Sequence, residues 1–530
     1  MDNQTINRCF MRFENRAERI TTKQVAETFV AVGPLLDLLS SRNNQIMYGR
    51  RGTGKTHALR YFQNVQNSEG HLAIYIDAQN IGSNGSIYND TELPLAERST
   101  RLLVDICTAI HAELLDIFTD PAKGWDLSTA APILDRFVDV FTETRIDGQI
   151  ERTSESAVKN ARHFEAGLSG ALSATDGLSL NAKAANQSAN ERSETERQTD
   201  SGKEASWIDF SYFARAIREL ASFIERRRLW ILIDEWTTVP PDIQPYLADL
   251  LRRAMFSVPN ITVKIAAIEH RSTFKLDLPN EGYIGLELGA DIHAAINLDD
   301  YLVIDNDEER AKNFFRTFIE NHAASVASEI DSRIDLDTLI TAAFTQDNVF
   351  TEFVRATEGV PRDAMHLLSL AAQKASSGAI TMPIIRTAAY SFFQTEKYNT
   401  IQSNQDNRLM LDWIRDEVIG KRRTRAFLLP VGTKDAIIDR LFDRRALHIL
   451  NRNRSAAHRP GERFVVYKMD YGLYIDLAAT DKFPTGTLFE GNDEIEVMDI
   501  DVPLDDARSF RRAILDLEQF YASHDNVAKS

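Results

Sequence analysis

The stretch Gly49-Arg50-Arg51-Gly52-Thr53-Gly54-Lys55-Thr56 is the part of this sequence that decides the fold. It fits the pattern G-x-x-x-x-G-K-[ST] at every position. Glycines let the backbone curl so that successive N–H groups face phosphate oxygens, and the helix that follows adds the positive end of its dipole. The stretch predicts a phosphate-binding loop for ATP, in which Lys55 reaches the β- and γ-phosphates and Thr56 ligates Mg²⁺. The candidate nucleotide-binding residues are Gly49, Arg50, Arg51, Gly52, Thr53, Gly54, Lys55, Thr56 and His57.

The residues on either side of this loop have the patterns that the motif requires. Asn44–Tyr48 is typical of a short strand that enters the loop, and His57–Phe62 is typical of a helix that leaves it. A chance match in a loop that binds nothing is the alternative. The strand–loop–helix context favours a nucleotide site.

A second motif is the apolar run that begins at Leu229 and ends in two acids, Asp234 and Glu235. Such a run predicts a buried parallel strand, whose carboxyl end lies on the phosphate side of an open α/β sheet. Asp234 is then the candidate to hold the Mg²⁺ ion and its water shell, and Glu235 the candidate to polarise the attacking water. The alternative is a structural strand followed by two solvated acids.

Two further runs predict strands of the same sheet, namely His71–Asp77 and Ile261–Ile268. The second run ends in Glu269, His270 and Arg271. In P-loop ATPases with an additional strand, a polar sensor residue occupies this position beside the γ-phosphate, so Glu269 and Arg271 are candidates. A salt bridge within a loop is the alternative.

The stretch Gly359-Val360-Pro361-Arg362 precedes a helical pattern. Arg362 at the start of that helix could contact the γ-phosphate as a second sensor. The alternative is an ordinary helix start, in which proline near the first position is common.

Taken in order and spacing, the motifs GRRGTGKTH, LWILIDEW, VKIAAIE and GVPRD resemble those of the AAA+ superfamily. Within it they resemble the branch of the ORC/CDC-type initiators and the neighbouring STAND-type switch ATPases, over about residues 15–475. The resemblance implies an ATP-binding α/β core with a parallel sheet, a helical lid and a winged-helix domain. It also implies ATP-dependent oligomerisation, often on DNA.

This chain departs from the family at the first sensor, which is often Asn, Ser or Thr. Because STAND-type members often carry arginine near this position, Arg271 is the better sensor candidate. An arginine from a neighbouring subunit could also stabilise charge on the transferring phosphoryl group. Arg252, Arg253 and Arg271 are the candidates for that finger.

The predicted domains are a core at residues 1–305, a helical lid at 306–400, a winged-helix-like domain at 401–480 and an acidic tail at 481–530. The core holds an insertion at about 148–205, where alternating residues flank Asp176-Gly177. Alternation around Asp-Gly predicts a β-hairpin. A disordered linker is the alternative.

In the predicted winged-helix-like domain, helices are expected at Leu409–Val418 and Lys434–Leu441, and strands at Phe464–Met469 and Gly472–Leu477. A small α+β packing domain without DNA contact is the alternative.

Charge is distributed unevenly along the 530 residues, whose net charge is −17. Lys421–Lys468 alone carries 13 basic and 4 acidic residues, whereas the tail is acidic. The basic segment predicts salt-sensitive contact with DNA, and binding to an acidic protein surface is the alternative.

The cysteine content and the hydropathy pattern bear on where in the cell the protein is expected. The two cysteines, Cys9 and Cys107, fit neither a disulfide framework nor a zinc site, which favours the cytoplasm. No apolar run is long enough to predict a membrane span.

Three functions follow as hypotheses. The first is an ATP-hydrolysing switch that forms homo-oligomers and regulates or recruits a protein effector encoded nearby. Bacterial proteins of this resemblance often lie in mobile or defence gene clusters, so antiphage defence is one setting for it. The second is a DNA-binding ATPase like a replication initiator or transposition regulator. The third is an ATP-binding scaffold with little hydrolysis.

Overall fold

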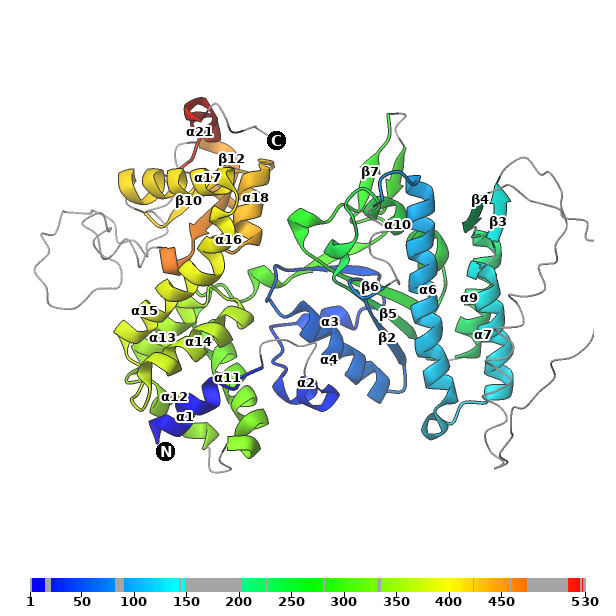
Figure 1. Ribbon diagram of the computed structural model, residues 1–530, viewed down its shortest axis with the longest axis horizontal. Helices are drawn as coiled ribbons and strands as arrows, with labels where there is room; N and C mark the ends of the chain where they lie inside the picture. The colour runs from blue at the N-terminus through cyan, green and yellow to red at the C-terminus, as the bar shows by residue number, and fades with distance from the viewer. Residues whose placement is uncertain are drawn as a thin grey trace, which may run out of the picture.

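A five-stranded parallel sheet forms the centre of the nucleotide-binding core in the computed structural model (Figure 1). The structure describes residues 2–14, 21–81, 90–142, 144–147, 203–206, 208–224, 227–279, 282–330, 335–422, 424–456, 459–473, 513–524 and 527. The strand order is β2-β5-β6-β1-β9, and every pairing is parallel. The strands are β1 (Gln45–Tyr48), β2 (Leu72–Asp77), β5 (Leu229–Asp234), β6 (Ile261–Ala267) and β9 (His293–Asn297).

The strands are almost continuously apolar because helices cover both faces of the sheet. Successive side chains point to opposite faces, so Ile231 and Ile233 belong to one buried cluster, while Trp230 and Leu232 belong to another. The second face is covered by α3 (Leu35–Leu39) and α4 (Lys55–Ser68). The first face is covered by α6 (Leu95–Thr119), α7 (Leu127–Thr142), α9 (Phe210–Phe223) and α10 (Gln244–Leu251).

The long insertion between β2 and β5 contains helices α6, α7 and α9 at the edge of the molecule (Figure 1). Strand β3 (Thr144–Asp147) pairs antiparallel with β4 (Lys203–Ser206). The pairing places Asp147 opposite Lys203. The predicted hairpin with its turn at Asp176-Gly177 lies outside the described residues.

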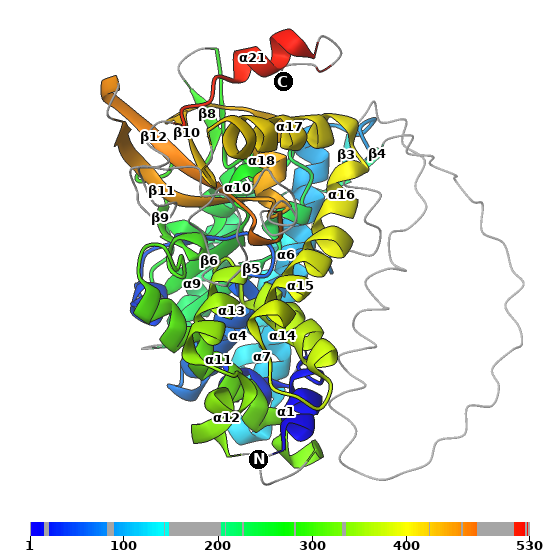
Figure 2. The same ribbon diagram turned by 90° about the vertical axis from the view of Figure 1, so that its left-hand side faces the viewer.

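The predicted lid is helical in the structure. Its helices are α11 (Glu308–Ile330), α12 (Leu336–Ala343), α13 (Asp347–Ala356), α14 (Pro361–Ala375) and α15 (Met382–Phe392). The first helix of the chain, α1 (Asn3–Phe10), packs with them although the predicted boundaries assigned it to the core (Figure 2). The buried Asn7 side chain donates to the carbonyls of Ser376 and Gly378, each at 2.9 Å.

The C-terminal domain contains a three-stranded antiparallel sheet in the order β10-β12-β11. Its elements are α17 (Gln405–Arg415), β10 (Ala426–Pro430), α18 (Ala436–Asp443), β11 (Leu447–Ala456) and β12 (Arg459–Met469). One face of this sheet and its helices belong to the same hydrophobic cluster as the lid, and the other face, with Leu428 and Val466, forms a separate small cluster. The two regions therefore share a core.

The prediction of a strand at 472–477 was wrong at its start, because Tyr471–Leu473 is helical. The long hairpin is formed by β11 and β12 instead. The physical reason is close packing: a Cβ on Gly472 would lie 2.4 Å from the Cβ of Phe393 and 2.7 Å from the carbonyl of Ala389. The chain packs tightly against the helical lid at this glycine. Residues 474–477 of the predicted strand lie outside the described residues.

The last described segment packs on the C-terminal domain. Leu428 accepts from Leu515 and donates to Ala513, and helix α21 (Leu517–Ser523) buries Phe520 beside Trp413. Glu490–Asp506, which contains the predicted acidic run, lies outside the described residues. No helix in the described part of the chain is long and apolar enough to cross a membrane.

Candidate nucleotide-binding site

The phosphate loop joins β1 to α4 at the carboxyl end of the sheet. Gly52 has a φ of 90°, a conformation that favours glycine. A Cβ at Gly52 would lie 2.8 Å from the Cβ of Arg362. The backbone N–H of Arg362 donates to the Gly52 carbonyl at 3.2 Å. The start of lid helix α14 therefore lies directly against the loop.

Lys55 is buried at the first turn of α4. Its Nζ donates to the carbonyls of Gly49 and Arg50, at 2.8 and 3.1 Å. Burial lowers the pKa of Lys55, while the charges of Asp234, Glu235 and Asp299 act in the opposite direction. Such an ammonium group gains strongly from an anionic ligand, because the ligand supplies the counter-charge that water cannot.

The acidic pair lies at the end of β5. Asp234 is fully buried, and its carboxylate accepts from the Tyr75 hydroxyl at 2.7 Å and from the Glu235 N–H at 2.8 Å. Glu235 has a φ of 51°, an uncommon left-handed conformation for a non-glycine residue. Burial and the neighbouring Asp234 raise the pKa of Glu235. The backbone turn separates the two carboxylates, and Glu235 lines the cavity.

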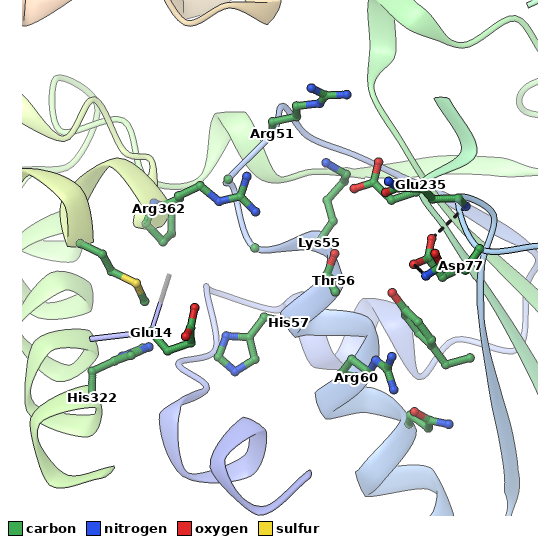
Figure 3. A pocket seen from close by; sticks show the side chains of 18 of the residues that line it. Glu14, Arg51, Lys55, Thr56, His57, Arg60, Asp77, Glu235, His322 and Arg362 are labelled. Atoms are coloured by element: carbon green, nitrogen blue, oxygen red, sulfur yellow. Dashed lines mark hydrogen bonds between the residues drawn. The ribbon is translucent and has the colours of Figure 1, made fainter. Parts of the chain in front are cut away.

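The cavity between the core and the lid has a volume of about 760 Å³ (Figure 3). Four acidic side chains line it, namely Glu14, Asp77, Glu113 and Glu235. Four cationic side chains also line it, and those around the phosphate loop suit a polyphosphate. The cationic side chains are Arg51, Lys55, Arg60 and Arg362.

One end of the cavity is formed by the lid and by residues that precede the sheet or follow its first strand in the chain. Phe318, His322 and Met365 line it from the lid, together with Glu14 and His57. In Figure 3, Glu14 lies between His57 and His322. Burial lowers the pKa of His322 to about 4, so this imidazole is neutral at physiological pH.

The residues present fit a Mg²⁺ ion. Thr56 lines the cavity, and Asp234 is hydrogen-bonded to two lining residues, Tyr75 and Glu235, with one donor on each carboxylate oxygen. A carboxylate has about four lone-pair sites, so Asp234 retains capacity for a water of the ion's shell. Hydroxyl and carboxylate oxygens are the ligands that Mg²⁺ prefers.

The predicted first-sensor residues contact the C-terminal domain. Glu269 lies 3.0 Å from Arg452, His270 lies 3.3 Å from Asp439, and Arg271 lies 3.4 Å from Asp443. None of the three lines the described cavity. These pairs join the loop to another domain, whereas the alternative left by the sequence was a salt bridge within the loop. The sensor roles of Glu269 and Arg271 stay predictions.

The other two finger candidates also have partners within the chain. Arg252 and Arg253 both pair with Asp249 at 2.6 Å, where α10 continues into the π-helical turn η3 (Arg252–Phe256). Neither lines the described cavity. A finger acts on the site of a neighbouring subunit, so this role too stays a prediction.

Sequence reasoning missed several residues of the site. Tyr75 and Asp77 lie on β2, in register with Leu232 and Asp234 of β5. An acid at the end of a predicted neighbouring strand was the available signal for Asp77. The side chain of Arg50 turns away from the cavity, although Arg50 was among the predicted nucleotide-binding residues. Nothing in the local motif distinguishes Arg50 from Arg51.

Comparison with known proteins places the chain among P-loop ATPases. Residues 13–352 match the model of the ORC-CDC6-like family. No curated protein matches the chain.

The solved structures that are similar to it include the following two. The Orc1 protein of Aeropyrum pernix in complex with DNA is 13% identical, with 86% of this chain and 95% of that chain covered and a TM-score of 0.32. A single-residue variant of Thermotoga maritima RuvB is also 13% identical, with 40% and 57% covered and a TM-score of 0.20.

Proposed function

Because the chain belongs to the ORC-CDC6-like family of AAA+ ATPases, we propose that it binds ATP with Mg²⁺ and hydrolyses it as a nucleotide-controlled switch. The observation that carries this proposal is the cavity between core and lid, which has the phosphate-loop Lys55 and the acidic Glu235 on its wall. Arg51 and Arg362 lie on either side of the loop and supply further positive charge for the triphosphate (Figure 3).

Each residue has a distinct task in this proposal. Lys55 neutralises the β- and γ-phosphates, and Arg362 brings the lid to the γ-phosphate. Glu235 accepts hydrogen bonds from the attacking water, and its raised pKa makes it a better proton acceptor than an exposed carboxylate. Thr56 and Asp234 hold Mg²⁺, which neutralises charge on the phosphates.

Two substitutions separate binding from hydrolysis. Lys55→Ala should abolish ATP binding, as measured by titration calorimetry. Glu235→Gln should retain binding and lose phosphate release. Unchanged phosphate release in both variants would overturn an ATPase function. Binding with no release in the wild type would favour a scaffold with little hydrolysis.

Oligomerisation and effector control are the next part of the proposal. Family membership supports ATP-dependent homo-oligomers, and Arg252, Arg253 and Arg271 are the candidate fingers from a neighbouring subunit. Native mass measurement with and without ATP tests assembly. A protein effector encoded nearby and a role in antiphage defence are tested by co-purification and by phage plaque counts with Glu235→Gln.

DNA binding is a second candidate function. The hairpin formed by β11 and β12, called the wing hairpin below, favours it. Arg463 and Lys434 are exposed. Arg454 is partly exposed on the same β11–β12 hairpin, where it lies opposite Phe464, and Arg463 lies opposite Ser455. Most other cations of residues 421–468 are used within the chain. The pairs are Lys421 and Arg422 with Glu417, Arg425 and Lys468 with Asp305, Arg445 with Asp363, Arg452 with Glu269 and Asp300, and Arg459 with Glu462.

The test for DNA binding therefore uses arginines of the wing hairpin outside these ion pairs. Replacing Arg454 and Arg463 by Ala should weaken binding to duplex DNA at low salt and reduce the salt slope by about two. The matched control replaces Arg136 and Arg215, which lie on α7 and α9 and both pair with Glu219. Equal affinities for both double variants would exclude the wing as the DNA contact.

A further inference from the structure

Arg50 has an unexpected position for a residue of a phosphate loop. Its side chain is only 4% exposed, and its Nε donates to Asp299 at 2.7 Å. The Arg50 backbone N–H donates to the second oxygen of the same carboxylate at 2.9 Å. Asp299 follows β9, so the pair ties the start of the loop to the neighbouring strand's end.

The rest of the Arg50 guanidinium enters the C-terminal domain. Nη1 donates to the Leu447 carbonyl at 3.0 Å, and both terminal nitrogens lie within 3.3 Å of His448 Nδ1. The guanidinium also lies 4.3 Å from the centre of the Phe442 ring. An arginine only donates, so His448 Nδ1 accepts. The loop and a domain almost 400 positions later therefore meet at one side chain.

The contact continues from His448 through a chain of buried charges. His448 Nε2 donates to Asp470 at 3.0 Å, and Lys397 donates to the same carboxylate oxygen at 2.6 Å. Lys397 also lies 3.0 Å from Asp363 in the first turn of α14. Burial and Arg50 lower the pKa of His448 to about 3, so the imidazole stays neutral and keeps its acceptor.

The chain of contacts returns to the phosphate loop. Asp363 accepts from Arg445 at 2.6 Å, and Arg445 also donates to the Arg51 carbonyl at 3.4 Å. A continuous network of hydrogen bonds and ion pairs therefore connects the loop, the C-terminal domain and the lid helix that carries Arg362. Breaking one contact of a buried network leaves a charge without its partner, which is costly. The loop, the C-terminal domain and helix α14 are therefore expected to move together.

We propose that Arg50 is a positioning residue through which the C-terminal domain holds the phosphate loop in its nucleotide-binding form. The proposal rests on nucleotide binding at this loop. Arg50 itself does not contact the phosphates. It orients the Gly49–Arg50 backbone, whose carbonyls hold Lys55, and it does so only while His448 is docked. By linkage, nucleotide and domain docking strengthen each other.

The experiment compares ADP affinity in the full chain for five proteins. Arg50→Ala should weaken ADP at least about tenfold, which corresponds to the loss of a charge-assisted hydrogen bond. His448→Ala should weaken ADP in the same direction. His448→Gln keeps an acceptor for Arg50 and a donor for Asp470, so it should restore the affinity. Asn453→Ala, at an exposed position of the same strand β11, is the control and should bind ADP like the wild type.

A second readout tests the coupling itself. Hydrogen exchange of β11 should slow when ADP binds to the wild type, and this protection should be lost in Arg50→Ala and His448→Ala. A purely local effect on the loop would lower affinity without changing the response of β11, and would overturn the coupling. If one variant fails to fold, the other still gives both readouts.

The outcomes separate this proposal from the proposed function. If the wild type binds neither ADP nor ATP, nucleotide binding fails and the role of Arg50 fails with it. If the wild type binds ADP and both alanine variants bind equally well, only the role of Arg50 is wrong.

Discussion

Two regions of this molecule contain several positively charged side chains, and these side chains face different surroundings in the two regions. In the cavity, Arg51, Lys55, Arg60 and Arg362 face a space large enough for a nucleotide. At the interface of the C-terminal domain, Arg50, Lys397, Arg445 and Lys468 face carboxylates of the same chain. The cations of the first region line a cavity, whereas those of the second form ion pairs that join parts of the same chain. Charge density alone therefore does not identify a binding surface.

The largest effect is expected at the cavity, on the rate of hydrolysis. Glu235→Gln should lower kcat about 10²- to 10⁴-fold, because it removes the carboxylate that polarises water. In free energy this is about 3 to 5 kcal/mol. Phosphate release measured at saturating ATP checks it. Tyr61→Phe, outside the cavity lining, is the control, and an equal loss there would contradict a specific role of Glu235.

The next effect tests the interface, on global stability. Arg445→Ala leaves Asp363 with Lys397 as its one remaining ion-pair partner among the described residues, and should cost about 3 to 5 kcal/mol in the free energy of unfolding. Urea denaturation measures it.

The matched control is Arg459→Ala, whose pair with Glu462 is exposed and should contribute less than about 1 kcal/mol. Equal losses in the two variants would remove the distinction between buried and surface pairs.

A smaller effect is expected where the two regions meet, at Arg362. Arg362→Ala should weaken ATP binding about ten- to hundredfold, because a charged hydrogen bond to the γ-phosphate contributes about 1.5 to 3 kcal/mol. ADP should be affected less, since it lacks that phosphate. Calorimetric titration with both nucleotides checks the prediction, and equal losses would place Arg362 away from the γ-phosphate.

The smallest effect concerns the pH dependence of the interface. Burial raises the pKa of Asp443 to about 6. The folded protein then binds this proton more tightly than the unfolded chain, so the contribution to stability is present below about pH 4 and is lost as pH rises through about 6. Asp443→Asn removes that dependence and still offers an oxygen to Arg271.

Urea denaturation of the wild type and Asp443→Asn at pH 4 and pH 7 measures this effect. The wild type should lose about 1 to 2 kcal/mol relative to Asp443→Asn between the two pH values. A constant difference between the two proteins would mean that the Asp443 carboxyl is not perturbed in the fold.

The fold of the core was accessible from sequence because its signals are local. The run ending at Asp234 is continuously apolar and the run ending at Tyr48 precedes a glycine-rich motif, and each forms a buried strand at the predicted place. The C-terminal domain was harder, because β11 contains Asn and Arg in alternation and its pairing with β12 is non-local. The helical turn at Gly472 depends on packing against Phe393, which no local pattern contains.

The sequence by itself determined the phosphate loop, the acidic strand end and the family, because each depends on residue types at short, fixed spacings. Only the tertiary structure decided that Arg51 faces the cavity while Arg50 enters the C-terminal domain. The two are identical in type and adjacent in the chain. The hydrogen-bond partners of Arg50 are residues 299, 447 and 448, far away in the sequence. The difference therefore arises from long-range packing, because a buried guanidinium needs acceptors.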